Sequence, residues 1–190
     1  MKNLLVLLTA TLLPLHAQTG DKLVTSARKQ IGVTVSYDPA YTTLAYPNGD
    51  VPNDRGVCTD VVIRAMRDAL SKDLQQLLHE DMRANFAVYP KNWSLARPDK
   101  NIDHRRVPNL KTWFKRQGYQ LAPADDKDPA KFLPGDLVTC TVPPNLPHIM
   151  IVSDRKTGAG VPLVIHNIGG GTREEDRLFE FKLTGHYRVK

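Results

Sequence analysis

The chain has 190 residues, enough for one domain with a substantial hydrophobic core. Apolar residues make up 41% of it and charged residues 24%, which excludes a disordered or fibrous protein. The formal net charge of +6 suits an anionic partner such as a cell-envelope surface. The basic residues are scattered and are not interleaved with aromatic residues, so we expect no nucleic-acid partner.

The N-terminus has the pattern of a secretory signal peptide. Lys2 gives a short basic start, an apolar run follows from Leu4 to Leu15, and Ala17 offers a small residue for cleavage before Gln18. The run is too short for a membrane span, so we predict a cleaved signal peptide over residues 1–17, with a retained N-terminal anchor as the alternative. Cleavage removes one lysine and lowers the net charge from +6 to +5. We therefore expect a periplasmic or secreted protein, with one domain over residues 18–190 and no membrane-spanning segment in the mature chain.

The first half of that domain has helical periodicity, interrupted by loops. A Pro-, Gly-, Asn- and Tyr-rich segment from Tyr37 to Arg55 reads as loop and turn. Apolar residues recur at helical spacing in four stretches, which we expect to be helices: 21–32, 58–71, 74–86, and a stretch that Pro108 begins and Gly118 closes.

After Pro134–Gly135 the pattern changes to alternation with a period of two. It predicts strands over residues 137–142, 148–153, 163–167 and 178–183. Helices followed by closely connected strands are typical of an α+β fold with an antiparallel sheet.

Cys58 is one of two cysteines, and it lies where the loop segment meets a predicted helix. A helix N-terminus has unpaired N–H groups and a positive dipole end, which lower a thiol pKa and can stabilise an oxyanion. In an oxidising compartment the same residue could instead form a disulfide with Cys140. Cys58 is therefore either a nucleophile or half of a disulfide.

Two histidines are expected to lie side by side near Cys58. If the hairpin of strands 148–153 and 163–167 turns symmetrically about Thr157, His148 and His166 face each other across it. A lone strand histidine is usually structural, but a facing pair suits a base and the group that orients it. Cys58, His148 and His166 are thus candidates for nucleophile, base and orienting residue.

The arrangement of these motifs resembles the NlpC-type papain-like enzymes of bacteria. The matching features are a cysteine at a helix start, a Pro134-Gly135-Asp136-Leu137-Val138 strand entry, and histidines at the head of one strand and on the next. Within that group the chain is most similar to a secreted bacterial family known as a domain of unknown function, through residues 56–62, 101–110, 148–154 and 165–169. The Thr59 that follows the cysteine departs from the Ser-Gly pair of many NlpC-type enzymes.

The resemblance implies a papain-like fold and hydrolysis of an amide or peptide bond in peptidoglycan, without a cofactor or a metal. It also implies that Cys140 is a free core residue on the first sheet strand. Several polar residues are candidates for substrate binding: Tyr46, Asp103, His104, Arg105 and Asn167. For the Asp103–Arg106 cluster, recognition of a substrate carboxylate stands beside a solvated loop that caps the third helix. For Tyr46 and Asn167 the alternatives are a cover for the core edge and a turn.

Two other functional classes remain open. A metal-dependent amidase could use His148 and His166 as ligands, with Asp154 or His104 as a third. A non-catalytic module could bind the cell envelope without releasing fragments. Thiol alkylation should abolish activity only in the cysteine hydrolase, and chelators only in the metal-dependent enzyme.

Overall fold

We analysed a computed structural model of the chain, in which residues 15–121 and 127–190 are described. The predicted signal peptide therefore lies outside the described residues, except for its last three. In the part of the chain that the structure describes, no helix is long and apolar enough to span a bilayer.

Most helices lie where the periodicity predicts them. Three α-helices begin within a residue of their expected start: α2 (Cys58–Leu70), α3 (Leu74–Asn85) and α4 (Val107–Arg116). The first helix is displaced: α1 spans Leu15–Arg28 instead of 21–32, and the residues after it form turns that include Gly32 at φ +78°. Short 3-10 helices occupy Phe86–Val88 (η1), Asp103–Arg105 (η2) and Pro129–Lys131 (η3).

A six-stranded sheet forms the second half of the chain, in the order β3-β8-β4-β5-β6-β7 with every neighbouring pair antiparallel. The strands are β3 (Gln120–Leu121), β4 (Leu137–Val142), β5 (Leu146–Lys156), β6 (Pro162–Asn167), β7 (Thr172–Glu175) and β8 (Lys182–Tyr187). A separate parallel pair joins β1 (Ser36–Tyr37) to β2 (Arg55–Gly56). The α+β class with an antiparallel sheet is confirmed.

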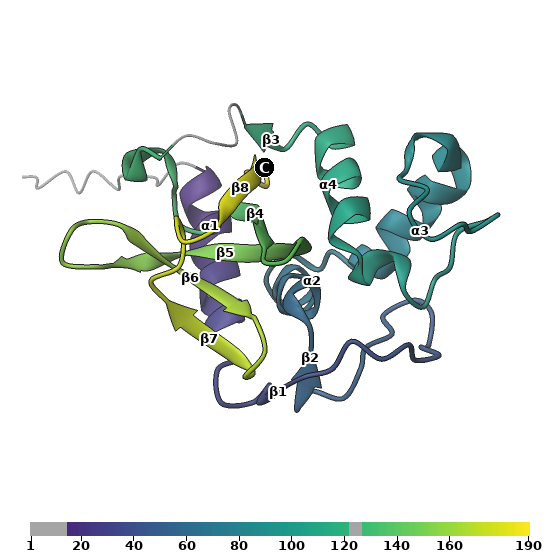
Figure 1. The fold of residues 1–190 in the computed structure, drawn as a ribbon, viewed down its shortest axis with the longest axis horizontal. Coiled ribbons are helices and arrows are strands. Elements are labelled where there is room, and N and C mark those ends of the chain that lie inside the picture. The colour runs from purple at the N-terminus through teal and green to yellow at the C-terminus, as the bar shows by residue number, and fades with distance from the viewer. Residues whose placement is uncertain (1–14, 122–126) are drawn as a thin grey trace, which may run out of the picture.

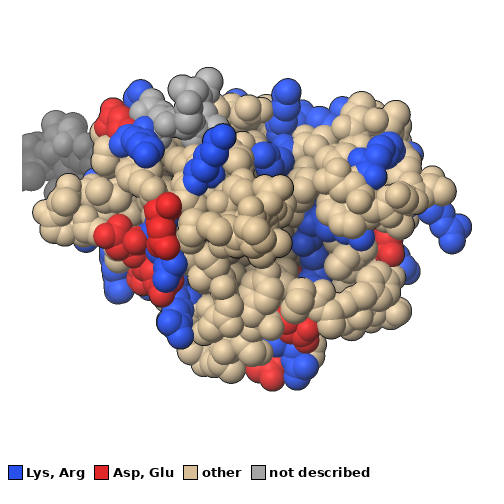
Figure 2. Space-filling view, viewed as in Figure 1, with Lys and Arg blue, Asp and Glu red and all other residues tan. Residues whose placement is uncertain are grey.

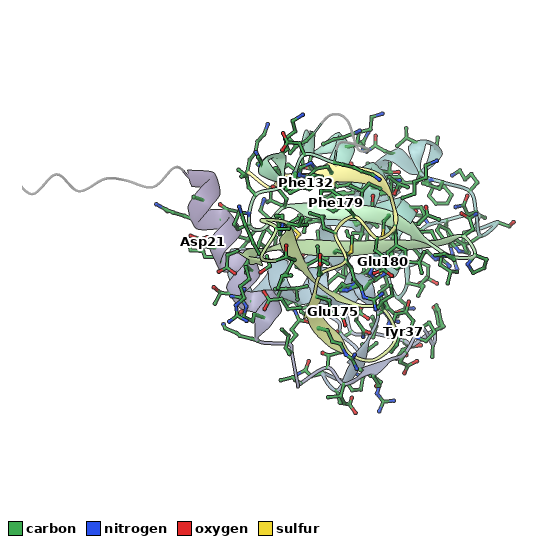
Figure 3. The ribbon with its side chains drawn as sticks, turned by 60° about the vertical axis from the view of Figure 1, so that its left-hand side comes forward. Asp21, Tyr37, Phe132, Glu175, Phe179 and Glu180 are labelled. Atoms are coloured by element: carbon green, nitrogen blue, oxygen red, sulfur yellow. The ribbon has the colours of Figure 1, made fainter. Side chains whose placement is uncertain are left out.

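The predicted strand over residues 178–183 is wrong. Residues 178–180 form a turn, and β8 begins only at Lys182. The apolar residues that suggested a strand pack instead on the sheet: Leu178 is fully buried, and the Phe179 ring lies edge-on to Phe132 at 5.3 Å (Figure 3). Strand β7, which pairs with β6 through the polar sequence Thr-Arg-Glu-Glu, has no apolar alternation to reveal it.

Two apolar clusters cover the two faces of the sheet. One face packs on α1 and α2 through Ile149, Ile151 and Ile165, and the other gathers Cys140, Met150 and Val164. Figure 1 shows α1 running behind β5 and β6, with α2 beside the end of β5. The sheet and α2 therefore fix the relative positions of Cys58 and the histidine strands.

Helix α1 also touches the entry to β4. A Cβ atom on Gly20 would lie 2.1 Å from the Pro134 carbonyl oxygen, so only glycine permits this approach. A mature chain that begins at Gln18 keeps Gly20 and this contact.

Candidate functional site

Cys58 begins α2, as predicted, and the short strand β2 that ends at Gly56 was not predicted. Val57 is extended at φ −116° and ψ −178°, and its N–H donates to Asp60 Oδ2 at 2.7 Å, which closes the first turn of the helix. Cys58 and Cys140 are both free thiols, and both are buried.

The thiol pKa differs from the expectation. Burial raises the pKa of Cys58 to about 12, and the Asp60 carboxylate adds to the rise. Hydrogen bonds from the backbone N–H groups of Ile149, Thr59 and Cys58 itself lower the pKa but do not compensate. The N–H groups at the helix start lower this pKa as predicted, but desolvation outweighs them and the net shift of the pKa is upward.

A buried ion pair anchors the start of α2. Both oxygens of Asp60 accept from Arg105, from Nε and Nη2, each at 2.9 Å. Arg105 also donates to the carbonyl oxygens of Asp38 and Ala40, both at 3.1 Å, and Thr59 Oγ1 donates to the Arg105 carbonyl at 3.1 Å. The candidate Arg105 therefore holds η2 and the segment before β2 against α2, and most of its N–H donors are engaged.

Asp103 and His104 are buried as well and Arg106 is partly buried, which contradicts the solvated-loop alternative. Asp103 accepts from the Asp99 N–H and from Arg106, and Asn109 Nδ2 donates to its carbonyl oxygen. Burial lowers the pKa of His104 to about 4, so His104 is neutral at pH 7. Both side chains lie inside the helical part of the domain.

Tyr46 and Asn167 occupy different places. Tyr46 lies against His79 of α3, with ring centroids 5.4 Å apart. Asn167 is fully buried at the end of β6, and its Nδ2 donates to the carbonyl oxygens of Gly56 at 3.0 Å and Ser36 at 3.1 Å. Asn167 thus ties β6 to the segment that carries Cys58, whereas Tyr46 belongs to the α3 side.

The two imidazoles are neighbours, as predicted, although the register differs. His148 Nε2 and His166 Nδ1 are 2.8 Å apart. The ladder pairs Ile151 with Ile165, which centres the hairpin one residue later than Thr157 and places the histidines diagonally rather than directly opposite. Diagonal neighbours share a face of the sheet, so the contact survives the shift.

Glu175 of β7 extends this pair, and the sequence pattern did not reveal it. Its Oε2 lies 3.3 Å from His166 Nε2, without the alignment of a full hydrogen bond, and 3.0 Å from Arg177 Nε. Figure 3 labels Glu175 on this strand. A carboxylate only accepts hydrogen bonds, so the proton of His166 is assigned to Nε2 and His166 Nδ1 accepts from His148. This tautomer leaves a lone pair on His148 Nδ1.

The histidine pair and Cys58 lie on opposite faces of β5. His148 is the register partner of Cys140 and alternates with Ile149, whereas Cys58 packs with Ile149 in the helix-covered cluster. The sulfur nevertheless reaches the Ile149 N–H, one residue from His148. No hydrogen bond joins Cys58 to either imidazole among the described residues.

Burial also sets the charge of the histidine pair. It lowers the pKa of His148 to about 3, with a contribution from His166. It lowers the pKa of His166 to about 4, although Glu175 opposes this change. Both imidazoles are therefore neutral at pH 7, as is the thiol.

A pocket of about 180 Å³ opens beside Cys58. Its lining is mainly apolar, with two arginines: Tyr37, Pro39, Val57, Cys58, Trp93, Ile102, Arg105, Arg106, Val107, Pro108 and Pro147. Cys58 is therefore the thiol that a ligand in this pocket would meet, and neither imidazole lines it. Arg106 belongs to the polar cluster that the sequence singled out, whereas nothing in the sequence pattern pointed to Trp93.

The side chains proposed as metal ligands are not arranged to bind an ion. In the described part of the chain, no three His, Cys, Asp or Glu side chains are grouped to hold an ion. The suggested third ligand Asp154 pairs with Arg28, and His104 is buried beside Arg105.

Comparison with known proteins defines the family. The model of a domain of unknown function, DUF1287, matches residues 24–189. The chain belongs to the DUF1287 family. It is also 53% identical over 178 residues to the "Uncharacterized protein YijF" of Escherichia coli (strain K12), an alignment that covers 94% of this chain and 85% of that protein. The expected membership of a family of unknown function is confirmed, and the relation of this DUF1287 domain to NlpC-type enzymes stays a prediction.

Proposed function

We propose that this DUF1287 protein is a papain-like thiol hydrolase that acts outside the cytoplasm and cleaves an amide bond of the cell envelope, in a peptide of peptidoglycan. Cys58 is the nucleophile, His148 the base and His166 the residue that orients the base. The observation that carries the proposal is the thiol at a pocket wall, with three backbone N–H groups directed at its sulfur. One of these groups belongs to Ile149, whose sequence neighbour His148 is hydrogen-bonded to His166.

The reaction begins from neutral groups. As Cys58 Sγ attacks the substrate carbonyl carbon, its proton passes to His148 Nδ1, and the N–H groups at the start of α2 stabilise the oxyanion. The imidazolium then gives that proton to the departing amine, which leaves a thioester on Cys58. Water, deprotonated by His148, hydrolyses the thioester and restores the thiol.

The step from Cys58 to His148 requires the two groups to approach. Hydrogen bonds between a nucleophile and its base commonly tighten only in the complex with substrate. At His148, β5 is paired with β4 through Cys140, whereas β6 pairs with no residue of β5 nearer to His148 than Ile151. The proposal therefore places the adjustment in the side chains of Cys58 and His148, on the side of β5 that β6 leaves unpaired.

Purified sacculi test the substrate. The protein is incubated with them and the released fragments are identified by mass, with expected products that carry a new amine and a new carboxylate. Binding without release would overturn the hydrolase in favour of an envelope-binding module. Release that chelators stop and thiol alkylation spares would favour the metal-dependent amidase.

A further inference from the structure

The pocket beside Cys58 presents cations but no acidic side chain. Its lining contains Arg105 and Arg106 and no aspartate or glutamate, and its other members are apolar or aromatic apart from the thiol. The acids that balance these arginines, Asp60 and Asp103, lie behind them with side chains 3% and 2% exposed. Figure 2 shows Lys and Arg atoms in a hollow between the lobe of α3 and α4 and the rest of the molecule.

The two arginines differ in the donors they have left. Arg105 uses Nε, Nη1 and Nη2 on Asp60 and on two carbonyl oxygens. In the described residues Arg106 uses only Nη1, which donates to Asp103 Oδ1 at 3.0 Å. The Nε and Nη2 groups of Arg106 are the ones available to a ligand.

Trp93 holds the Arg106 guanidinium in place. The guanidinium carbon lies 4.0 Å from the centroid of a Trp93 ring, a cation–π contact. The stack and the Asp103 bond together fix the plane of the group, which reduces the entropy lost when it binds a ligand. A planar guanidinium with two adjacent free donors matches a carboxylate.

We infer that Arg106, stacked on Trp93, binds a carboxylate of the substrate in the pocket at Cys58, so that the protein selects peptides with a free carboxylate close to the bond it cleaves. The inference rests on the proposed function in one respect, namely that the bound molecule is a substrate. The anion site itself requires only the pocket, the thiol and the guanidinium. The apolar remainder of the lining suits an aliphatic stem between the carboxylate and the reacting carbonyl.

Two alkylating reagents of matched size test the site. Iodoacetate is anionic and iodoacetamide is neutral, and both react with the same Cys58 thiolate, so the ratio of their rates cancels the thiol pKa. We expect the ratio of the iodoacetate rate to the iodoacetamide rate to be roughly fivefold higher in the unaltered protein than in Arg106→Gln, the factor for a unit charge pair about 4 Å apart in water. Rates are read from the peptide that contains Cys58.

Substitutions assign the effect to Arg106. Arg106→Gln should therefore lose this preference for the anionic reagent, and Arg106→Lys should retain part of it. Lys22→Gln removes the same charge from an exposed position of α1 and should leave the ratio unchanged. A ratio that Arg106→Gln does not alter would overturn the inference.

A measurement on the unaltered protein covers the case in which Arg106→Gln does not fold. Acetate should slow the reaction of Cys58 with iodoacetamide more than acetamide does, and equal protection would overturn the inference. These results are independent of hydrolysis. If Cys58 prefers the anionic reagent but the protein releases nothing from sacculi, the proposed function is contradicted and the anion site stands. If the protein releases fragments but shows no anion preference, only the anion site is contradicted.

Discussion

At Cys58, burial and backbone N–H groups act in opposite directions on one sulfur atom. The N–H groups favour the thiolate, and the apolar surroundings favour the thiol by a larger amount. Burial also keeps His148 neutral. We therefore expect the thiol proton of Cys58 to move to His148 as the bond to the substrate forms, without a thiolate–imidazolium pair in the resting protein.

This charge state predicts the pH dependence of alkylation. With a pKa of about 12, the thiolate fraction of Cys58 rises about tenfold per pH unit from pH 7 to pH 10. The second-order rate with iodoacetamide should rise in the same proportion without reaching a plateau. A plateau below pH 8 would instead indicate an ion pair between the thiol and an imidazole.

The sequence pattern predicted the positions of Cys58 and of the two histidines, but their charge states depend on tertiary packing. The helix start predicted the place of Cys58, and strand parity predicted the contact between His148 and His166. Parity is preserved when a hairpin shifts by two residues, so an incorrect register still gave the correct neighbours. The raised pKa of Cys58 depends on burial, and the contact of Glu175 with His166 depends on the polar edge strand β7. Apolar periodicity predicts neither.

The attachment of α2 depends on the Asp60–Arg105 pair. Asp60→Asn keeps an acceptor for the Val57 N–H but leaves the Arg105 guanidinium buried without its counter-charge. We expect the free energy of unfolding to fall by about 3–5 kcal/mol. Urea denaturation of the two proteins measures the difference.

Asp68→Asn is the matched control on the same helix. Asp68 pairs with Lys29 at the surface, with side chains 53% and 65% exposed, so water already screens the pair. Its loss should change the unfolding free energy far less. If both substitutions cost the same, burial of the Asp60–Arg105 pair does not stabilise the domain as argued.

The elements with strong apolar periodicity could be predicted from the sequence, and those with weak or misleading periodicity could not. Helices α2 and α3 and strand β4 lie within a residue of their expected bounds. The run from Leu178 to Phe181 alternates like a strand because its apolar residues fill gaps at the sheet surface. The short strands β1, β2 and β3 are set by contacts between distant segments, such as the Asn167 bonds to Ser36 and Gly56.

The domain as a unit should lose stability on mild acidification. Burial lowers the pKa of His104 and His166 to about 4 and that of His148 to about 3, whereas an unfolded histidine has a pKa of about 6.5. Below pH 6.5 the unfolded chain therefore binds more protons than the folded one, and the unfolding free energy falls until the pH reaches the folded values. Near pH 5 we expect an uptake of about three protons on unfolding, measured from the slope of the unfolding free energy against pH.

His104→Gln separates the contribution of His104 to this proton uptake from those of His148 and His166. His104 does not line the Cys58 pocket, and its replacement should reduce the uptake by about one proton. An unfolding free energy that stays constant between pH 7 and pH 5 would show that these histidines are not held neutral by the fold.

The central claim is that Cys58 is the nucleophile and Cys140 a core residue. Release of fragments from sacculi by Cys58→Ala and Cys140→Ala, compared with the unaltered protein, tests it most directly. Cys58→Ala should fold and release nothing, because the sulfur at the pocket wall is gone. Cys140→Ala should keep most of the activity, since Cys140 packs among apolar residues of the other sheet face. Equal activity in the two variants, or loss only in folded Cys140→Ala, would contradict the account.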